Sequence, residues 1–362
     1  MKIGILAFNR SLRFMGGALV APDVYKEILT AGGFDAEIVA INATGCPLDY
    51  PWTDRSYLFN ETAWKDELPY LYDRFILINY TSLGRCEEQK WHMNRICHFL
   101  DSLPLKSYAL VLHDEYEIMG PFIKKLVQEH GIRDRWLFNS ESVREHLGAF
   151  FNITGGVMTH ARPGRYQFTI EEKTGDIHYL GRLYDEQKLL VALLTLCSSL
   201  GRDVTIYGRE YRPFIEKMIP SLSSQLQSLW NTSYKGPVTD SNNVISVRRP
   251  FKFSWNVVRG YAARLIHLRT FQGEFMPRLE QSTYEAIRAG SLPILVKSTI
   301  PSWFPHEYAI ILDNYDVNRM IYQIKDQLIY DSNTVERLHE CNNLLDRRIE
   351  LSLENLREIL NF

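Results

Sequence analysis

Apolar runs and amphipathic stretches alternate from the start of the chain. Residues 2–8 form an apolar, partly β-branched run, and a helical pattern follows over residues 18–31. Similar buried-strand patterns recur at residues 36–41, 75–80, 108–112 and 136–138. Between them, helical patterns cover about residues 87–101, 118–130 and 141–149. Strands that alternate with helices are typical of βαβ units, so the pattern predicts a mostly parallel sheet.

The same alternation starts again after residues 151–168, a passage punctuated by Gly and Pro. Strand patterns are predicted in the segments IHYLGRL, DVTIYG, NVISV, LPILV and AIILD. Helical patterns cover residues 185–200, 317–330 and 333–360, and the basic stretch after Trp255. No internal repeat relates the two halves.

We therefore expect an α/β protein with two Rossmann-like domains. The first is predicted over residues 1–165 and the second over residues 166–340, with a closing helix at 341–362 that returns to the first domain. Open parallel sheets bind ligands beyond the carboxyl ends of their strands. The functional site is therefore expected in a deep cleft between the two domains.

Composition limits the function classes. The 362 residues are 45% apolar and carry a net charge of −2, which excludes a protein that coats nucleic acid or membranes through bulk charge. No run of about 18 apolar residues occurs, so a cytoplasmic protein is expected. The odd, scattered cysteines predict reduced thiols: Cys46, Cys86, Cys97, Cys197 and Cys341.

A glycine pair follows the first predicted strand. Gly16 and Gly17 lie where a backbone approaches a ligand or turns tightly, ahead of a helix N-terminus that favours an anionic group. Turn geometry alone also explains the pair. The segment matches neither GxGxxG nor the P-loop pattern, so a dinucleotide or P-loop site is disfavoured.

A histidine and two acids follow another predicted strand, in the segment LVLHDE. His113 and Asp114 would point into the ligand crevice, where a histidine beside a carboxylate is suited to act as a general base. The alternative is a helix cap or a hydrogen-bonded surface histidine.

Two cations flank the turn in GRLYDEQKLL. Arg182 offers a planar fork to phosphate oxygens and Lys188 a mobile charge, so together they suit a diphosphate. The alternative is a solvated helix start with an ion pair between Asp185 and Lys188.

Two glutamates precede an apolar strand in PRLEQSTYEAIRAGSLPILVKS, residues 277–298. Glu285 lies on a helix of small residues and could bind both hydroxyls of a ribose, while Glu280 would lie near a sugar. The backbone N–H groups around Ser282 and Thr283 would face phosphate. The alternative is a pair of exposed glutamates stabilised by the helix dipole.

Residues 248–269 are rich in cations and aromatic rings and contain no acid. The combination predicts contacts with a nucleic-acid backbone and an exposed base, through Arg248, Arg249, Lys252 and Arg259. The alternative is an amphipathic helix whose arginines pair with acids of the same domain.

The segments GRLYDEQK and EAIRAGSLPIL together resemble the nucleotide-sugar half of retaining GT-B glycosyltransferases. The five-residue spacing of Glu280 and Glu285, with LVLHDE and MKIGILAFNR, resembles more closely the phage DNA α-glucosyltransferases. The resemblance implies the GT-B fold, a diphosphate clamp of Arg182 and Lys188, and a ribose ligand at Glu285. It places Gly17, Ser282 and Thr283 in the donor site, and His113, Asp114 and Glu280 near the reaction.

The same resemblance implies an activity. A sugar would pass from a UDP-sugar, with retention, to the hydroxymethyl group of a modified pyrimidine in double-stranded DNA, most simply 5-hydroxymethylcytosine, and protect the DNA from nucleases. Glucose and arabinose both stay open as the sugar. No resident cofactor and no required metal are expected, and a monomer is expected. The alternative is a bacterial GT-B enzyme with a lipid or polysaccharide acceptor, for which the aromatic stretch at residues 50–72 could form a membrane-facing patch.

Overall fold

The computed structural model describes most of the chain, in the ranges 1–9, 17–42, 53–78, 89–104, 107–112, 116–164, 166–181, 187–208, 214–238, 244–257, 277 and 279–361. The chain divides into two compact units. Along the sequence, the division falls between Pro163 and Gly164 and again between Asp346 and Arg347. The first unit therefore contains both ends of the described chain, and the second unit lies between them in the sequence.

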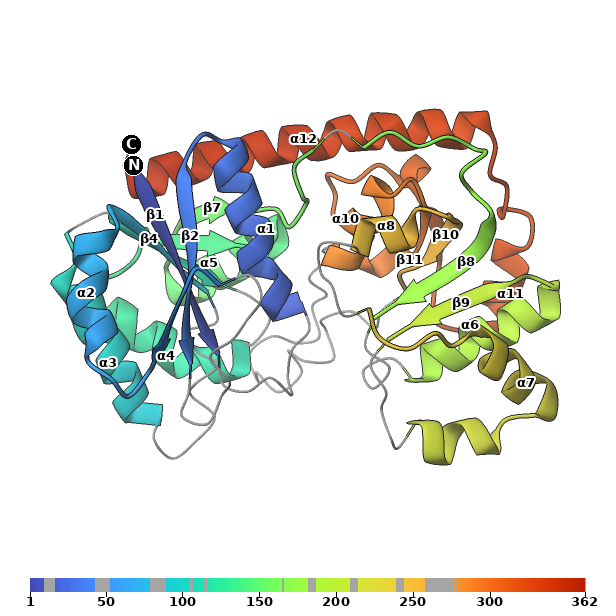
Figure 1. Cartoon of the computed structure of the whole chain (residues 1–362), viewed down its shortest axis with the longest axis horizontal. Helices are drawn as coiled ribbons and strands as arrows, with labels where there is room; N and C mark the ends of the chain where they lie inside the picture. The colour runs from blue at the N-terminus through green and yellow to red at the C-terminus, as the bar shows by residue number, and fades with distance from the viewer. Residues whose placement is uncertain are drawn as a thin grey trace. The chain divides into compact units, whose positions relative to one another are not determined.

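Unit 1 contains a seven-stranded parallel sheet with the order β3-β2-β1-β4-β5-β6-β7 (Figure 1). Its strands are β1 (Lys2–Asn9), β2 (Asp35–Asn42), β3 (Arg55–Leu58), β4 (Arg74–Ile78), β5 (Tyr108–Leu112), β6 (Trp136–Phe138) and β7 (Gly155–Val157). Its helices before the division are α1 (Gly17–Ala31), α2 (Ala63–Leu71), α3 (Gln89–Ser102), α4 (Tyr116–Gln128) and α5 (Glu141–Phe151). The parallel sheet confirms the predicted α/β class.

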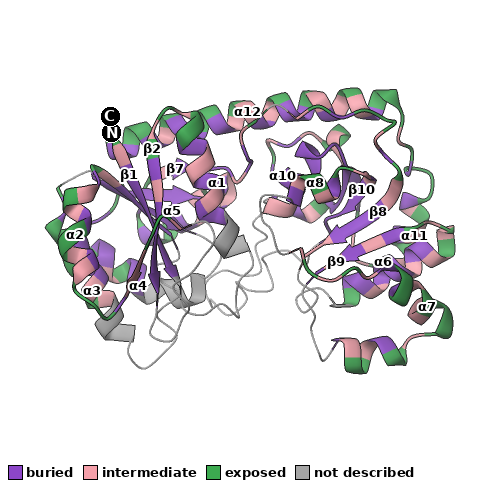
Figure 2. Cartoon of the chain, in the orientation of Figure 1, coloured by how far each residue is buried: buried purple, intermediate pink, exposed green. Residues whose placement is uncertain are grey.

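Most strands of unit 1 are short apolar runs because both faces of the sheet are covered, whereas the edge strand β3 is only partly buried. Every residue of β5 is buried, and the strands of both sheets are mostly purple in Figure 2. An aromatic cluster packs against β1 in the core. The centroid of the Trp64 ring lies 5.1 Å from that of Phe99 and 5.8 Å from that of Phe59. The Trp64 indole donates to the Phe59 carbonyl oxygen at 3.2 Å, which satisfies its buried N–H.

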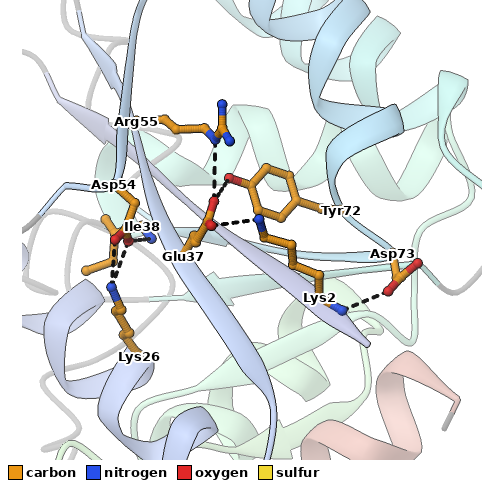
Figure 3. Close-up of polar contacts among 8 residues, drawn as sticks. All are labelled: Lys2, Lys26, Glu37, Ile38, Asp54, Arg55, Tyr72 and Asp73. Atoms are coloured by element: carbon orange, nitrogen blue, oxygen red, sulfur yellow. Dashed lines mark hydrogen bonds and ion pairs between the residues drawn. The ribbon is translucent and has the colours of Figure 1, made fainter.

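A polar cluster lies on β2 of the same unit (Figure 3). The carboxylate of Glu37 accepts a hydrogen bond from the Tyr72 hydroxyl at 2.6 Å and pairs with the Lys2 ammonium at 2.6 Å. Arg55 contacts the same carboxylate at 3.4 Å. Burial alone would raise the pKa of Glu37, but the donors Lys2, Tyr72 and Arg55 outweigh it and lower the pKa to about 2.

Unit 2 contains a five-stranded parallel sheet with the order β12-β11-β10-β8-β9. Its strands are β8 (Gly175–Leu180), β9 (Val204–Tyr207), β10 (Phe251–Trp255), β11 (Leu292–Val296) and β12 (Ile310–Leu312). Its α-helices are α6 (Gln187–Leu200), α7 (Ser224–Ser233), α8 (Val244–Arg248), α10 (Gln281–Arg288), α11 (Val317–Ile324) and the first part of α12 (Ser332–Leu360). The chain runs from β8 to β9 on one side and returns to β10 on the other, so the strand order reverses between β8 and β10.

One predicted strand of unit 2 is wrong. Residues 244–247 of this segment, VISV, lie in the helix α8, and the strand follows at Phe251–Trp255. The β-branched residues of NVISV prefer a strand only weakly, and that preference yields to context. The position beside β8 is occupied by β10, whose Phe253, Ser254 and Trp255 are buried. The predicted helix at 317–330 is shorter and ends at Ile324.

Helix α12 begins in unit 2 and its last residues belong to unit 1. In unit 1, Arg74 donates to the backbone oxygen of Leu360 at 3.1 Å, and Arg135 to that of Ile359 at 2.8 Å. Guanidinium groups at a helix C-terminus satisfy carbonyls that have no partner inside the helix and complement the helix dipole. No helix in the described part of the chain is long and apolar enough to cross a membrane.

Candidate functional site

The candidate site lies where β10 ends and α10 begins, in unit 2. Asn256 follows the last residue of β10, and its amide donates to the Ser282 hydroxyl at 3.0 Å in the first turn of α10. This is the carboxyl end of a strand next to the point where the strand order reverses. Open α/β sheets bind their ligands at such a position.

The start of α10 supplies backbone donors. Glu280 is the N-cap residue and makes no side-chain capping bond to the helix. The Thr283 N–H donates to the backbone oxygen of Glu280 at 2.9 Å. The N–H groups before it, at the very start of a helix, have no partner inside the helix and carry a partial positive charge. A phosphate group is the kind of ligand that such a helix start binds.

Polar atoms without a partner surround the start of this helix. The Oδ1 atom of Asn256 and the Oε1 atom of Gln281 are buried and have no hydrogen-bond partner among the described residues. Asn256 is 5% exposed. Buried polar atoms are nearly always hydrogen-bonded in folded proteins. Two such acceptors at one strand end therefore indicate a polar ligand.

The carboxylate of Glu285 lies one turn further along α10 and is held on both oxygens. The Gln281 amide donates to Oε1 at 3.0 Å, and the Arg248 guanidinium lies 3.4 Å from Oε2. Glu285 is 5% exposed. A carboxylate with a donor on each oxygen has a fixed orientation, so it can present its lone pairs to hydroxyl groups in a defined geometry.

Arg248 is completely buried behind this carboxylate. Its Nη1 atom donates to the Nε2 atom of His178 at 2.9 Å and to the Ser254 hydroxyl at 3.3 Å. Burial, and then the charge of Arg248, lower the pKa of His178 well below its ordinary value, so the imidazole is neutral at pH 7. The carboxylate that pairs with Arg248 is that of Glu285.

The prediction that Arg248 contacts DNA is wrong. Its exposed fraction is 0%, so the guanidinium cannot reach a phosphate in solution. Arg248 and Arg249 are adjacent cations in the sequence. In the structure the Arg248 side chain is buried, whereas that of Arg249 is exposed.

The other predicted DNA contacts differ in their surroundings. Arg249 is exposed and makes a two-pronged ion pair with Glu172, with N–O distances of 2.8 and 2.9 Å. This ion pair agrees with the alternative interpretation, in which the arginines of residues 248–269 pair with acids of the same domain. Lys252 is half-buried on β10, and its charge acts on Asp176 of the neighbouring strand. Arg259 lies outside the described residues.

Several predicted site residues also lie outside the described ranges: His113, Asp114 and Arg182. Gly17 is the first residue of α1. Lys188 is the second residue of α6, and its side chain is exposed. Among the described residues the structure brings together Ser282, Glu285 and Arg248, with Thr283 and Glu280 on the same first turns of α10. No group of three His, Cys, Asp or Glu side chains in the described ranges is placed to hold a metal ion.

Three described residues of the site are missing from the sequence predictions: His178, Ser254 and Asn256. The position of Asn256, a polar residue directly after an apolar strand, is the signal that singled out His113, and it could have found Asn256 too. His178 and Ser254 give no signal, because they are cross-strand neighbours on β8 and β10 whose pairing only the sheet register reveals.

No protein-family model matches the chain, and no curated protein matches it. Solved structures do match. Anabaena Alr3699/HepE in complex with UDP-glucose is 11% identical, with a TM-score of 0.65 over 99% of both chains. An α-glucosyltransferase in complex with UDP and a 13-mer DNA is 14% identical, with a TM-score of 0.59 over 99% of this chain and 95% of that one.

T4 phage BGT in complex with UDP-glucose is 11% identical, with a TM-score of 0.57 over the whole of both chains. The chain has the GT-B fold. The two parallel sheets of the GT-B fold are those of units 1 and 2, as the sequence resemblance implied. At these identities the matches establish the fold, and the chemistry of the site has to be argued from its own residues.

Proposed function

We propose that the chain is a glycosyltransferase that binds a UDP-sugar at the start of α10 and moves the sugar to an acceptor. One observation carries the proposal: a carboxylate fixed on both oxygens, Glu285, lies one turn from a helix start beside the unpartnered polar atoms of Asn256 and Gln281. A nucleoside diphosphate has the matching chemistry, with vicinal hydroxyls for a carboxylate and phosphates for backbone N–H groups.

The donor would then lie along α10. Glu285 accepts hydrogen bonds from the ribose hydroxyls, and Glu280 lies beside the sugar. The N–H groups of residues 281 and 282 bind phosphate, with Thr283 next to them in the first turn. Arg182 and Lys188 stabilise the negative charge that develops on the diphosphate as it leaves. These roles agree with the resemblance to retaining GT-B enzymes, and the matched structures that contain UDP-glucose support the donor class.

For the acceptor, we propose the hydroxymethyl group of a modified pyrimidine in DNA, with 5-hydroxymethylcytosine as the first choice. His113 or Asp114 takes the proton from the attacking hydroxyl. Gly17, the first residue of α1, stays a candidate donor-binding residue. The spacing of Glu280 and Glu285 and the matched structure that holds UDP and DNA support this acceptor. Arg249, Lys252 and Arg259 stay as candidate DNA contacts, and Arg248 does not. The acceptor base must leave the stack to be reached.

The lipid alternative loses its main support. It relied on an aromatic surface at residues 50–72, but Phe59, Trp64, Leu68 and Tyr72 of this stretch are buried in the core of unit 1. The one fully exposed ring among the described residues of the stretch is Tyr70, at 90% exposure. A single ring is too small an apolar surface for an interfacial anchor.

Incubation of the protein with radiolabelled UDP-glucose or UDP-arabinose tests the proposal. Duplexes that contain 5-hydroxymethylcytosine, 5-hydroxymethyluracil or unmodified cytosine serve as acceptors, and nucleosides are then analysed by mass spectrometry. Label on a hydroxymethylated base only is the expected result. Label on a lipid or glycan, with none on DNA, would keep the donor site and overturn the acceptor; no release of UDP from any donor would overturn both.

A further inference from the structure

We propose that Arg248 is a positioning residue of the donor site: it fixes the carboxylate of Glu285, and through it the preference for ribonucleotide over deoxyribonucleotide donors. The inference rests on the proposed function, because it concerns how Glu285 meets the ribose. Arg248 itself does not touch the ligand, since it is buried behind Glu285.

The guanidinium of Arg248 is held in place by three side chains. Nη1 donates to His178 Nε2 at 2.9 Å and to Ser254 Oγ at 3.3 Å, and Nη2 lies 3.4 Å from Glu285 Oε2. His178 and Ser254 are register partners on β8 and β10, in the middle of the sheet. The rigid sheet therefore orients the planar guanidinium, and the guanidinium orients the carboxylate.

The charge states of the groups around Arg248 explain why its guanidinium pairs with Glu285. The imidazole of His178 is neutral, because burial and the charge of Arg248 disfavour its protonated form. Arg248 is always charged at physiological pH. Among the described residues, Glu285 is the acid that pairs with the buried guanidinium, and loss of Glu285 would leave that cation buried without this partner.

The backbones that carry Arg248 and Glu285 are also tied together. The Ser291 hydroxyl, just beyond α10, donates to the backbone oxygen of Arg248 at 3.2 Å. The Lys173 ammonium donates to the backbone oxygens of Arg249 and Ala289, both at 2.7 Å. The ends of α8 and α10 therefore form one rigid frame, which preorganises the pair before a ligand binds.

A buried ion pair can also be merely structural, so the test needs a readout that stability alone does not change. Selectivity between UDP and 2′-deoxy-UDP is such a readout. A fixed carboxylate is paired with the ribose hydroxyl in UDP and is left without that partner in 2′-deoxy-UDP. If the ion pair were only structural, its loss would weaken the binding of both nucleotides equally and leave the ratio of their affinities unchanged.

Calorimetric titration with both nucleotides is carried out on the wild type, Arg248→Met, Glu285→Gln and the double variant. We expect the wild type to bind UDP at least about tenfold more tightly than 2′-deoxy-UDP, and Arg248→Met to reduce that ratio to about two. Arg288→Met is the matched control. Arg288 is also buried on α10, where it pairs with Asp346 at 2.6 Å, and its loss should lower the melting temperature and keep the ratio.

The double variant covers the case in which Arg248→Met fails to fold, because removal of both charges avoids an unpaired buried ion. If Arg248 acts through Glu285, the double variant has the same nucleotide ratio as Glu285→Gln. A different ratio, or a wild-type ratio in a folded Arg248→Met protein, would overturn the inference. Equal binding of both nucleotides by the wild type would overturn this inference and keep the donor proposal, whereas no binding of UDP would overturn the proposed function.

Discussion

The ammonium nitrogen of Lys173 lies 2.7 Å from the backbone oxygen of Ala289, the residue that ends helix α10. The same nitrogen lies 2.7 Å from the backbone oxygen of Arg249, and the side chain is buried against Phe168 and Tyr330. Burial lowers the pKa of Lys173 to about 7; the charge of Glu172 opposes the shift and that of Arg249 adds to it. One lysine thus joins the two helices of the candidate site and titrates near neutral pH.

Lys173 should make stability depend on pH above neutrality. Its pKa is about 7 in the folded protein, against about 10.4 in an unfolded chain, so between these values the unfolded chain binds more protons and stability rises with pH. We expect the wild type to gain on the order of 1 kcal/mol relative to Lys173→Gln between pH 7 and pH 9. Urea unfolding of both proteins across this range measures the gain, and a constant difference would contradict it.

Glu37 should stabilise unit 1 in the opposite pH range. Its folded pKa of about 2 lies below the unfolded value of about 4.3, so its contribution is complete above pH 4.3 and disappears as pH falls through 2. We expect Glu37→Gln to cost on the order of 1–2 kcal/mol at pH 7 and progressively less below pH 4. Denaturant curves at pH 7, 5, 4 and 3 give the comparison. An equal loss at all four values would show that the carboxylate charge contributes nothing.

Arg135 should fasten the end of α12 to unit 1. It is buried and donates to the backbone oxygen of Ile359, so Arg135→Met leaves that carbonyl without its donor. We expect a loss of about 1–3 kcal/mol of unfolding free energy, with faster amide exchange in the last turns of α12. Arg133→Met is the control, because Arg133 is exposed and should change stability by less than about 0.5 kcal/mol.

Gly290 should tolerate no side chain. Its φ angle is +72°, and an added Cβ would lie 2.3 Å from the Phe168 ring, which stacks on His339. We expect Gly290→Ala to cost at least about 2 kcal/mol from backbone strain and displacement of the ring. Gly201→Ala separates the two causes, because Gly201 has a φ angle of +61° with open space around it. Similar losses in both variants would mean that the ring moves freely.

Arg182 should act on the transition state of sugar transfer. If it stabilises the departing diphosphate, Arg182→Ala lowers kcat by about 10²-fold or more. Initial rates with a UDP-sugar give kcat and KM separately. Near-wild-type turnover would remove Arg182 from the diphosphate clamp and leave the role to other cations.

The sequence predicts most strands of the two sheets because they are buried on both faces and read as apolar runs, as in LPILV. It misses β3, which is only partly buried, the three-residue β7, and β10. The helix pattern predicts α10, and the resemblance singles out Glu285 as a residue of the donor site. The sequence misassigns Arg248, because a charge pattern carries no information on burial. It gives no signal for His178 and Ser254, whose pairing with Arg248 depends on the register of two strands more than 70 residues apart.

The division of α12 between the units has a consequence for the order of synthesis. In unit 1, Asn355 donates to the backbone oxygen of Val157 at 2.9 Å, and Ser352 accepts from the backbone N–H of Thr159 at 2.9 Å. The strands of unit 1 leave the ribosome before unit 2 does, but these residues leave it after unit 2. Unit 2 ends at Asp346 and is complete earlier. On a nascent chain, unit 2 can therefore finish folding before the last helix turns of unit 1 have been synthesised.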